Sequence, residues 1–271
     1  MKAWIDGRGK SMARTLSPLV RVLRARGALA HLGDYAAFLE GRGSGSGWDP
    51  DGEAKAVSKQ IKRPDAVIFD VGANDGRWSL ALARQLGSGN GQFYLFECSP
   101  YVLPRLRERL GKIPRATLVE AAVSHESGTV QLHTPTRGSG LASLHERRDV
   151  GIQQEHYESV SVRSVTIDSV VEERGIERID LLKMDIEGHE LHALKGAARI
   201  LGRRGVAAIE FEFGSANVNS RTFFRDYYDL LTEAGFAISR IAPRGTLFPV
   251  QAYHERLEYF RGATNYLAVL Q

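Results

Sequence analysis

From Val67 onward, short apolar strands alternate with amphipathic helices, and this alternation constrains the fold more than any other feature of the sequence. Strands are predicted at 67–71, 93–97 and 116–123, with helices between them at about 77–86 and 101–110. Strands that are joined through helices pair in parallel, because a crossover returns the chain to the same end of the sheet. We therefore expect a doubly wound α/β sheet whose ligand site lies at the carboxyl ends of the strands.

A second series of alternating elements follows an irregular middle part. Residues 128–165 interrupt the rhythm with two strand-like segments and a Gly/Ser-containing stretch, which predicts an inserted hairpin or lid. Beyond it, helices are predicted at about 167–174, 189–201 and 223–234, and strands at 179–185 and 206–213. The apolar segments 236–241 and 265–270 are expected to close the sheet as an antiparallel pair.

The N-terminal part of the chain has a different character. Residues 1–47 are predicted to form a helical segment and a flexible connector, since glycine occupies every second position of 41–47, and the main domain is expected at 48–271. An amphipathic helix near the start could touch an anionic membrane surface or a partner, but packing of its apolar side on the domain is favoured. Its basic and apolar residues are Arg14, Arg21, Arg24, Arg26, Leu16, Leu19, Val20 and Leu23.

Composition argues against several classes of protein. The single cysteine, Cys98, excludes an internal disulfide and is typical of a reduced, cytoplasmic protein. No apolar run approaches the roughly 20 residues that span a bilayer, and the first residues lack the apolar core of a signal peptide. The net charge of +4 is spread along the chain, so nucleic-acid binding is not expected.

The segment VIFDVGANDG is the first motif that carries chemistry. It places Asp70 and Gly72 at the end of a strand and Gly76 at the start of the next helix, so the turn must be tight and open to a ligand. The carboxylates of Asp70 and Asp75 would repel a pyrophosphate. They suit S-adenosylmethionine, which has no phosphate and carries an amino group, and the loop therefore predicts this cofactor.

Glu97 supplies a second acidic signal at the end of the next strand, FYLFE. A carboxylate at this position can accept both hydroxyls of a ribose. A surface carboxylate that merely ends a strand is the alternative, and the neighbouring glycine loop makes that alternative less favourable.

Together with the segments FECSP, VTID and KMDIEGHE, these motifs resemble the FkbM-type methyltransferases in order and spacing over about 66–270. The resemblance implies a Rossmann-like class I methyltransferase with a mostly parallel seven-stranded sheet, S-adenosylmethionine as methyl donor, and a sugar or polyketide-type hydroxyl as acceptor. Asp70, Gly72 and Asn74 match the cofactor loop of the family, and Glu97 matches its ribose-binding acid. The most specific pattern is K-x-D-x-E-G-x-E, formed here by Lys183, Asp185, Glu187, Gly188 and Glu190.

Methyl transfer to a hydroxyl needs a group that removes the proton. Asp185 is the first candidate for this base and His189 the second, with Glu187 as the third catalytic candidate at the same strand end. Capping of the following helix is the alternative role for the two carboxylates. In another arrangement, Asp185 joins Glu187 or the strand acids Glu210 and Glu212 in binding a divalent cation such as Mg²⁺, which the sequence does not require.

Several side chains near this strand end have ordinary explanations. Glu210 and Glu212 share one face of their strand, and an exposed strand end would explain them equally well. His189 and His192 are three residues apart on a helix and could pair on a ligand, but solvated or core-edge histidines are favoured over a metal site. The stretch 137–144 is a candidate lid in which Ser139 and Ser143 could bind hydroxyls, or an ordinary connecting loop.

The sequence thus favours an S-adenosylmethionine-dependent O-methyltransferase that acts on a sugar, a glycan or a glycosylated small molecule. O-methylation of a polyketide-type hydroxyl is an alternative. A nucleotide-dependent oxidoreductase with a degenerate glycine loop and a non-catalytic Rossmann-like binding module are alternatives of other classes.

Overall fold

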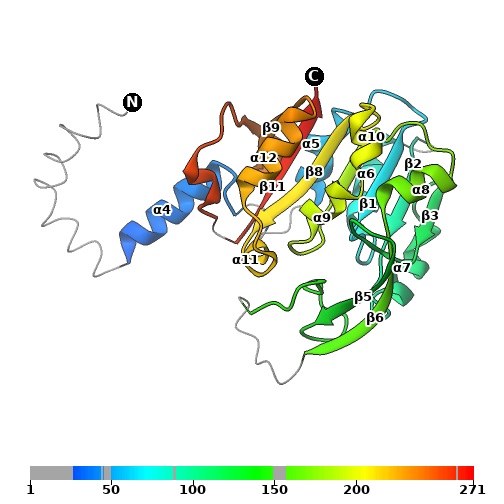
Figure 1. The fold of residues 1–271 in the computed structure, drawn as a ribbon. Helices are drawn as coiled ribbons and strands as arrows, with labels where there is room; N and C mark the ends of the chain where they lie inside the picture. Colours follow the sequence, from blue (N-terminus) through cyan, green and yellow to red (C-terminus); the bar gives the residue numbers. More distant parts are fainter. Residues whose placement is uncertain (1–26, 44, 46–49, 88–89, 149–156, 261) are drawn as a thin grey trace, which may run out of the picture.

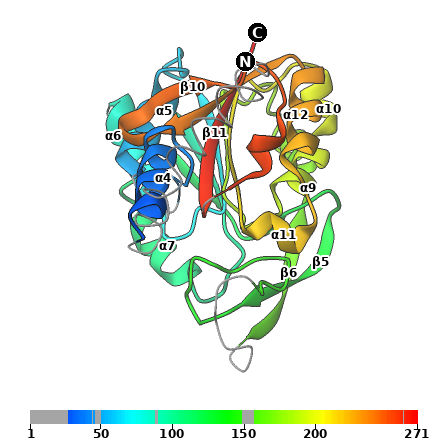
Figure 2. The same cartoon turned by 90° about the vertical axis from the view of Figure 1, so that its left-hand side faces the viewer.

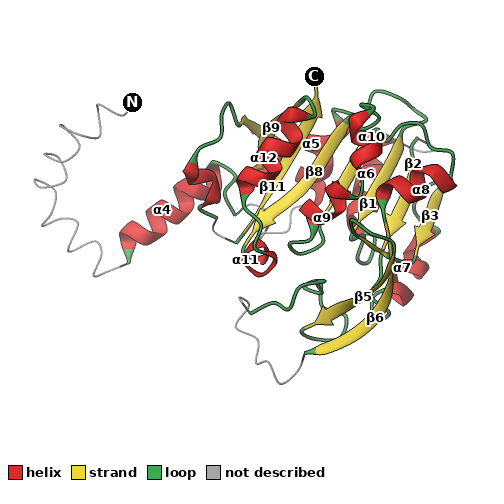
Figure 3. Ribbon diagram, viewed as in Figure 1, coloured by secondary structure: helices red, strands yellow, loops and turns green. Residues whose placement is uncertain are grey.

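The computed structural model describes residues 27–43, 45, 50–87, 90–148, 157–260 and 262–271. Within these residues the main sheet has eight strands in the order β10-β9-β11-β8-β7-β1-β2-β3. Figure 3 shows the sheet with helices packed along it. The α/β fold that the alternating elements predict is confirmed.

Five neighbouring strands of the described chain run parallel, and they create the ligand-binding edge. They are β3 (Ala116–Val119), β2 (Gln92–Phe96), β1 (Val67–Val71), β7 (Leu181–Met184) and β8 (Ala208–Gly214). The chain runs outward from β1 to β2 and β3, and later returns to the other side of β1 as β7 (Figure 1). This reversal is the topological switch point, next to which open α/β sheets bind their ligands.

The other end of the sheet is antiparallel. β11 (Ala263–Leu270) lies between β8 and β9 (Phe236–Ala242), as expected for the closing pair. An additional strand, β10 (Thr246–Pro249), pairs with β9 after the short 3-10 turn η3 (Pro243–Gly245), so the described sheet has one strand more than the seven expected. β10 is short, largely exposed and ends in proline, which are features of an edge strand without a hydrophobic signal. A second 3-10 turn, η4 (Glu255–Glu258), precedes β11.

Helices cover both faces of the sheet and enclose two hydrophobic cores (Figure 2). One face carries α5 (Pro50–Ser58), α6 (Arg77–Leu86) and α7 (Leu103–Leu110); the other carries α8 (Ile167–Glu173), α9 (Glu190–Lys195), α10 (Ala198–Gly202) and α12 (Phe224–Glu233). A short helix, α11 (Ala216–Ser220), follows β8. Because both faces are covered, β1, β7 and β8 are almost wholly buried, which explains their continuous apolar sequences.

Two predicted elements are each divided in the structure. The strand expected at 116–123 consists of β3 in the main sheet and β4 (Ala122–Val123), which belongs to a second sheet. The helix expected at 189–201 is broken between α9 and α10. At this break Gly196 passes close to another segment: a Cβ atom there would lie 2.1 Å from the carbonyl oxygen of Ser124.

The segment expected as an insertion, 128–165, contains the other strands of the second sheet. β5 (Gly128–Thr134) and β6 (Glu158–Val165) form an antiparallel hairpin, and β4 pairs with β6, which gives three strands among the described residues. Figure 1 shows this hairpin beside the main sheet, below the arrowhead of β8 in that view. Residues 139–144, which follow β5, line a cavity at the carboxyl edge where ligands are expected.

Part of the N-terminal segment is visible as α4 (Ala28–Leu39), which extends away from the main sheet in Figure 1. The basic amphipathic helix predicted around Arg14 to Arg26 lies outside the described residues. The described glycines of the predicted flexible connector contact the domain, since the amide of Gly43 donates a 2.8 Å hydrogen bond to Thr264 and Gly41 packs against the backbone of Ile241. None of the described helices is both long enough and apolar enough to cross a membrane.

Asp168 of the VTID segment joins two helices of one face. Its carboxylate accepts hydrogen bonds from the backbone amides of Arg199 and Ile200, at 2.8 and 2.9 Å, in the first turn of α10. These amides have no partner within their own helix, so a buried acid from α8 caps α10.

We predict that Asp168→Ala lowers the free energy of unfolding by about 1–2 kcal/mol, the usual cost of a lost cap. Urea denaturation measures this change, and Asp229→Ala, which removes an exposed acid of α12, is the matched control. Equal stability of the two variants would show that α10 does not depend on Asp168.

Candidate active site

Two neighbouring cavities lie at the switch point, where β1 and β7 end. Their volumes are about 280 and 360 Å³, and we call them the first and the second cavity. The described residues that line both are Gly45, Gly72, Asn74, Asp185 and Glu212. The ends of β1, β7 and β8 therefore meet at one place, as expected for this fold.

Gly72 occupies a position that admits no side chain. Its φ is +80°, and a Cβ atom would lie 2.0 Å from the carbonyl oxygen of Asp185. The backbone after β1 thus lies directly against the backbone after β7. Asn74, two residues further, has φ of 48° and lines both cavities. The predicted cofactor loop is therefore tight and borders the space that a ligand can occupy.

Glu97 connects this loop to β2. Its carboxylate accepts hydrogen bonds from the backbone amides of Asn74, Cys98 and Ser99, at 2.9, 2.8 and 2.7 Å, and it lines the first cavity. Burial raises the pKa of Glu97 above its usual value, although the three amides oppose this change. A carboxylate offers about four acceptor positions, so capacity remains for ligand hydroxyls, as the prediction for Glu97 requires.

Asp70 lies fully buried beneath the loop, outside the described linings of both cavities. It accepts a 2.6 Å hydrogen bond from the Ser79 hydroxyl and lies 3.4 Å from Lys183 Nζ, which is also 3.4 Å from Asp185. Burial lowers the pKa of Lys183, but the surrounding carboxylates, led by Asp70 and Asp185, raise it above its usual value overall. Direct contact of Asp70 with the cofactor stays a prediction, while the structure shows Asp70 holding the ammonium group that supports Asp185.

Asp75 and Gly76 complete the loop. The Asp75 carboxylate forms ion pairs with Arg77 and Arg109, both at 2.9 Å, and lines the second cavity. Because two guanidinium groups compensate its charge, the expectation that Asp75 repels a phosphate does not hold. Gly76 begins α6 with φ of 77° and lies outside the described linings of both cavities, so it serves the turn.

Among the described residues, three carboxylates come together at this edge: Asp185, Glu187 and Glu212 each offer an oxygen within 4.8 Å of the others. The predicted grouping of Asp185 and Glu212 with Glu210 is wrong in its third member. Glu210 lies earlier on the same face of β8, opposite Lys183, and only 2% of it is exposed. An exposed strand end therefore does not explain Glu210, whose pKa is raised well above its usual value by burial and by the nearby Glu53.

A comparison with protein families agrees with this arrangement. The model described as the methyltransferase FkbM domain matches residues 70–238, which is more than half of the 271 residues. The chain belongs to the FkbM methyltransferase family. The matched region begins at Asp70, at the end of β1, and ends in β9. It therefore contains the switch point, the inserted hairpin, and Gly72, Asn74, Asp185 and Glu212, which line both cavities.

Curated relatives of this FkbM-family chain include two methyltransferases. The 2-O-methyltransferase NoeI of Sinorhizobium fredii is 31% identical over 160 residues, which are 54% of this chain and 63% of NoeI. The hexuronic acid methyltransferase AglP of Haloferax volcanii is 26% identical over 152 residues, which are 55% of this chain and 57% of AglP. The chain therefore spans about three-fifths of the length of these relatives.

Solved structures that resemble the chain include the methyltransferase FkbM from Methylobacillus flagellatus. It has 16% sequence identity and a TM-score of 0.48, and the match covers 81% of this chain and 50% of that protein.

In this FkbM-family site, Glu187 turns toward the inserted segment. Its carboxylate forms an ion pair with Arg147, and its carbonyl oxygen accepts a 2.8 Å hydrogen bond from the Ser143 hydroxyl. We call residues 137–148 the lid segment, since 139–144 also line the first cavity. Glu187 has φ of 55°, an unusual backbone conformation for glutamate. Its guanidinium partner makes Glu187 a poor candidate for a base and suits it to hold the lid segment in place.

His189 directly precedes α9 as its N-cap residue and lines the first cavity, but only 6% of it is exposed. Its Nε2 lies 2.9 Å from the Ser124 hydroxyl and its Nδ1 lies 3.0 Å from His145 Nε2. Burial and the neighbouring histidines lower the pKa of His189 to about 3. Because both ring nitrogens already have partners and the ring is a weak base, His189 is less suited than Asp185 to remove a proton.

Four further residues shape the FkbM-family site without having been predicted for it. Lys183 and Glu190 belong to the K-x-D-x-E-G-x-E pattern. A charged residue in a buried strand, and another at the start of a helix, could have indicated that both have a role in the site. Glu53 lines the second cavity from α5, and His145 reaches His189 from the lid segment. No local pattern points to these two, because only the tertiary fold brings them to the edge of the sheet.

Glu190 organises the loop that carries Asp185 and Glu187. It is fully buried and accepts hydrogen bonds from the backbone amides of Ile186, at 2.9 Å, and Gly188, at 3.2 Å. Burial raises the pKa of Glu190 from 4.5 to about 7.

A protonated folded-state Glu190 makes the stability of the protein pH-dependent. Between pH 4.5 and 7 the unfolded chain loses this proton while the folded chain keeps it, so stability falls as the pH rises and is constant above that window. We predict that wild type loses up to about 3 kcal/mol relative to Glu190→Gln across this window. Urea denaturation of both proteins between pH 5 and 8 measures this difference, and a difference that does not change with pH would contradict the raised pKa.

Proposed function

We propose that this chain is an S-adenosylmethionine-dependent O-methyltransferase that methylates a hydroxyl group of a sugar or glycan. One observation carries the proposal: in a member of the FkbM methyltransferase family, Glu97, the glycine loop and Asp185 border a single cavity at the switch point. The names of NoeI and AglP, a 2-O-methyltransferase and a hexuronic acid methyltransferase, support an oxygen acceptor on a carbohydrate.

The charge of the first cavity supports the cofactor. Its described lining includes no lysine or arginine, but it contains the carboxylates Glu97, Asp185, Glu187 and Glu212. A dinucleotide would bring two phosphates into this acidic space, whereas a sulfonium nucleoside with an amino group is attracted to it. The acidic lining of the first cavity, together with the family, favours a methyltransferase over a nucleotide-dependent oxidoreductase.

Asp185 is the residue to which we assign proton removal. Its side chain is 43% exposed and borders both cavities, so it can reach a hydroxyl that enters from solvent. The cofactor supplies a methyl group on a positively charged sulfur, a good leaving group. The Asp185 carboxylate accepts a hydrogen bond from the acceptor hydroxyl, orients its oxygen and receives its proton. The Lys183 ammonium group lies 3.4 Å from this carboxylate and forms an ion pair with it.

Polar residues of the lid segment favour an acceptor with several hydroxyl groups. Ser139 lines the first cavity and Gly140 lies close to Asn74 of the cofactor loop, whereas the Ser143 hydroxyl already donates to the Glu187 carbonyl. We further propose that the chain acts in the cytoplasm on a small-molecule or glycan acceptor, without binding nucleic acid. A divalent cation such as Mg²⁺ at Asp185, Glu187 and Glu212 is an optional addition to this proposal. A polyketide-type hydroxyl remains the alternative acceptor.

The first test is calorimetric titration with S-adenosylhomocysteine, with NAD as a parallel titration. We predict micromolar binding of the first ligand alone. Glu97→Gln should weaken it by about 1–3 kcal/mol, since a charged hydrogen-bond acceptor is lost. Glu120→Gln, which changes an exposed acid just after β3, should bind like wild type. Binding of NAD alone would overturn the cofactor assignment, and binding of neither ligand would favour a non-catalytic module.

The second test separates chemistry from binding. Asp185→Asn should reduce methyl transfer by about 10²–10⁴-fold, the usual contribution of a general base, with nearly unchanged affinity for S-adenosylhomocysteine. Turnover is measured as formation of S-adenosylhomocysteine with a panel of uronic acid glycosides and neutral sugars, and Asp229→Asn is the surface control. Near-normal turnover of Asp185→Asn would assign the proton transfer elsewhere.

A further inference from the structure

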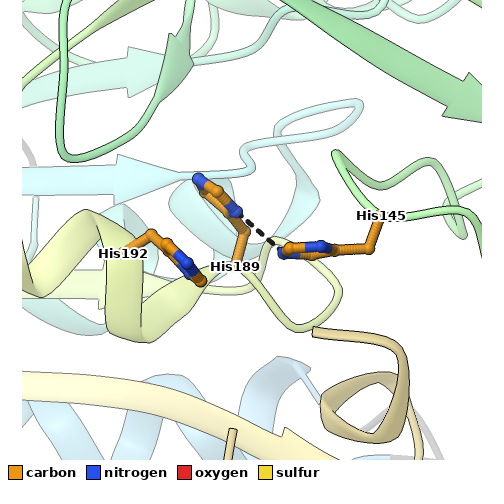
Figure 4. A group of neighbouring side chains, drawn as sticks. All are labelled: His145, His189 and His192. Carbon is orange, nitrogen blue, oxygen red and sulfur yellow. Dashed lines mark hydrogen bonds between the residues drawn. The ribbon is translucent and has the colours of Figure 1, made fainter. Parts of the chain in front are cut away.

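Three imidazole side chains converge beside the first cavity: His145, His189 and His192. Among the described residues they form a group in which one ring nitrogen of each lies within 4.8 Å of the others. Figure 4 shows that His189 and His192 come from the start and the first turn of α9, whereas His145 reaches them from the lid segment. Two elements that are far apart in sequence thus supply one cluster.

The spacing of these rings suits a shared cation. His145 Nε2 and His189 Nδ1 lie 3.0 Å apart, and the His189 and His192 rings are stacked with centroids 4.4 Å apart. A zinc ion bonds imidazole nitrogens at about 2.0–2.1 Å, which sets neighbouring nitrogens roughly 3.4 Å apart. The His189 and His192 rings are nearly parallel, so one of them must rotate about its side-chain bonds before all three nitrogens face one ion.

Two further observations point to a ligand. The Ser124 hydroxyl lies 2.9 Å from Nε2 of His189, which leaves Nδ1 to face the cluster; metal-binding histidines are commonly oriented by such a hydrogen bond on the other nitrogen. His192 Nδ1 is buried and has no hydrogen-bond partner among the described residues. A buried nitrogen without a partner costs free energy, which a bound ion next to it offsets.

We propose that His145, His189 and His192 bind one transition-metal ion, of which Zn²⁺ is the representative. Three neutral nitrogen donors favour zinc, cobalt, nickel or copper over magnesium, which prefers oxygen donors. This site is separate from the Asp185, Glu187 and Glu212 group. The proposed ion does not depend on the proposed methyl transfer, since the contacts that support it involve neither the cofactor nor the acceptor.

The ion would join the lid segment to α9. The lid segment is already held there by Ser143 and Arg147, which both contact Glu187. A metal bond to His145 would replace its hydrogen bond to His189 as the third connection, next to the first cavity that His189 lines. Three protein ligands leave a tetrahedral ion one open position for water or for an oxygen of a ligand in that cavity.

The test uses the full chain after removal of metal with a chelator, followed by calorimetric titration with Zn²⁺ and, separately, Mg²⁺. We expect one Zn²⁺ per chain and no comparable binding of Mg²⁺. Titration with Co²⁺ should produce the intense visible absorption of a tetrahedral site. No stoichiometric Zn²⁺ binding, or equal binding of Mg²⁺, would overturn the proposal and leave the cluster held by hydrogen bonds and ring stacking.

Variants locate the ion. His145→Gln lies on the lid segment and His192→Gln is only partly buried, so both should fold, as circular dichroism will verify. Loss of an orienting partner alone lowers metal affinity by about 10–100-fold, so loss of a ligand should lower it at least tenfold. His133→Gln, a neighbouring histidine bonded to Ser159, is the matched control and should bind like wild type. Unchanged affinity in both ligand variants would place the ion elsewhere. Titration of every variant with S-adenosylhomocysteine separates this result from the test of the proposed function.

Discussion

The contact between the backbones at Gly72 and Asp185 is the constraint on which the rest of the site depends. A single methyl group at Gly72 would lie 2.0 Å from the Asp185 carbonyl, so the loops after β1 and β7 can approach only with glycine there. Asp185 continues the ladder by donating its amide to Val71, at 3.0 Å. This approach leaves the Asp185 side chain at the border of both cavities, and Glu97 then fixes the remaining loop through the amide of Asn74.

The distribution of charge follows from the same geometry. Around Lys183 lie more carboxylates than one ammonium group can compensate, and burial together with mutual repulsion raises the pKa of Glu210 and Glu212 well above the usual value. Such an edge is poorly suited to phosphates and gains electrostatic stabilisation from a cation. A positively charged ligand at this edge would be stabilised by the neighbouring carboxylates, which is consistent with the proposed sulfonium cofactor.

The sequence predicted the features that depend on local pattern. Alternating strands and helices gave the sheet, and the positions of Gly72, Glu97 and Asp185 at strand ends gave one shared site. Features that depend on tertiary neighbours were missed: the edge strand β10 has no hydrophobic signal, and the helix break at Gly196 follows from contact with Ser124. The compensation of the Asp75 charge was missed for the same reason, because Arg109 forms its ion pair with Asp75 from α7.

In the folded chain, the first residues of the K-x-D-x-E-G-x-E pattern line the cavities, and the later ones contact the lid segment. Lys183 lies in β7, Asp185 follows it directly, and both line the second cavity. The chain then turns at Glu187, which has a positive φ. Glu187 and His189 then contact Arg147 and His145 of the lid segment. The K-x-D-x-E-G-x-E motif thereby connects the carboxyl edge of the sheet, where the cavities lie, to the lid segment. The lid segment and the proposed base are consequently positioned by the same loop, in which Glu187 contacts Arg147 and Ser143 two residues after Asp185.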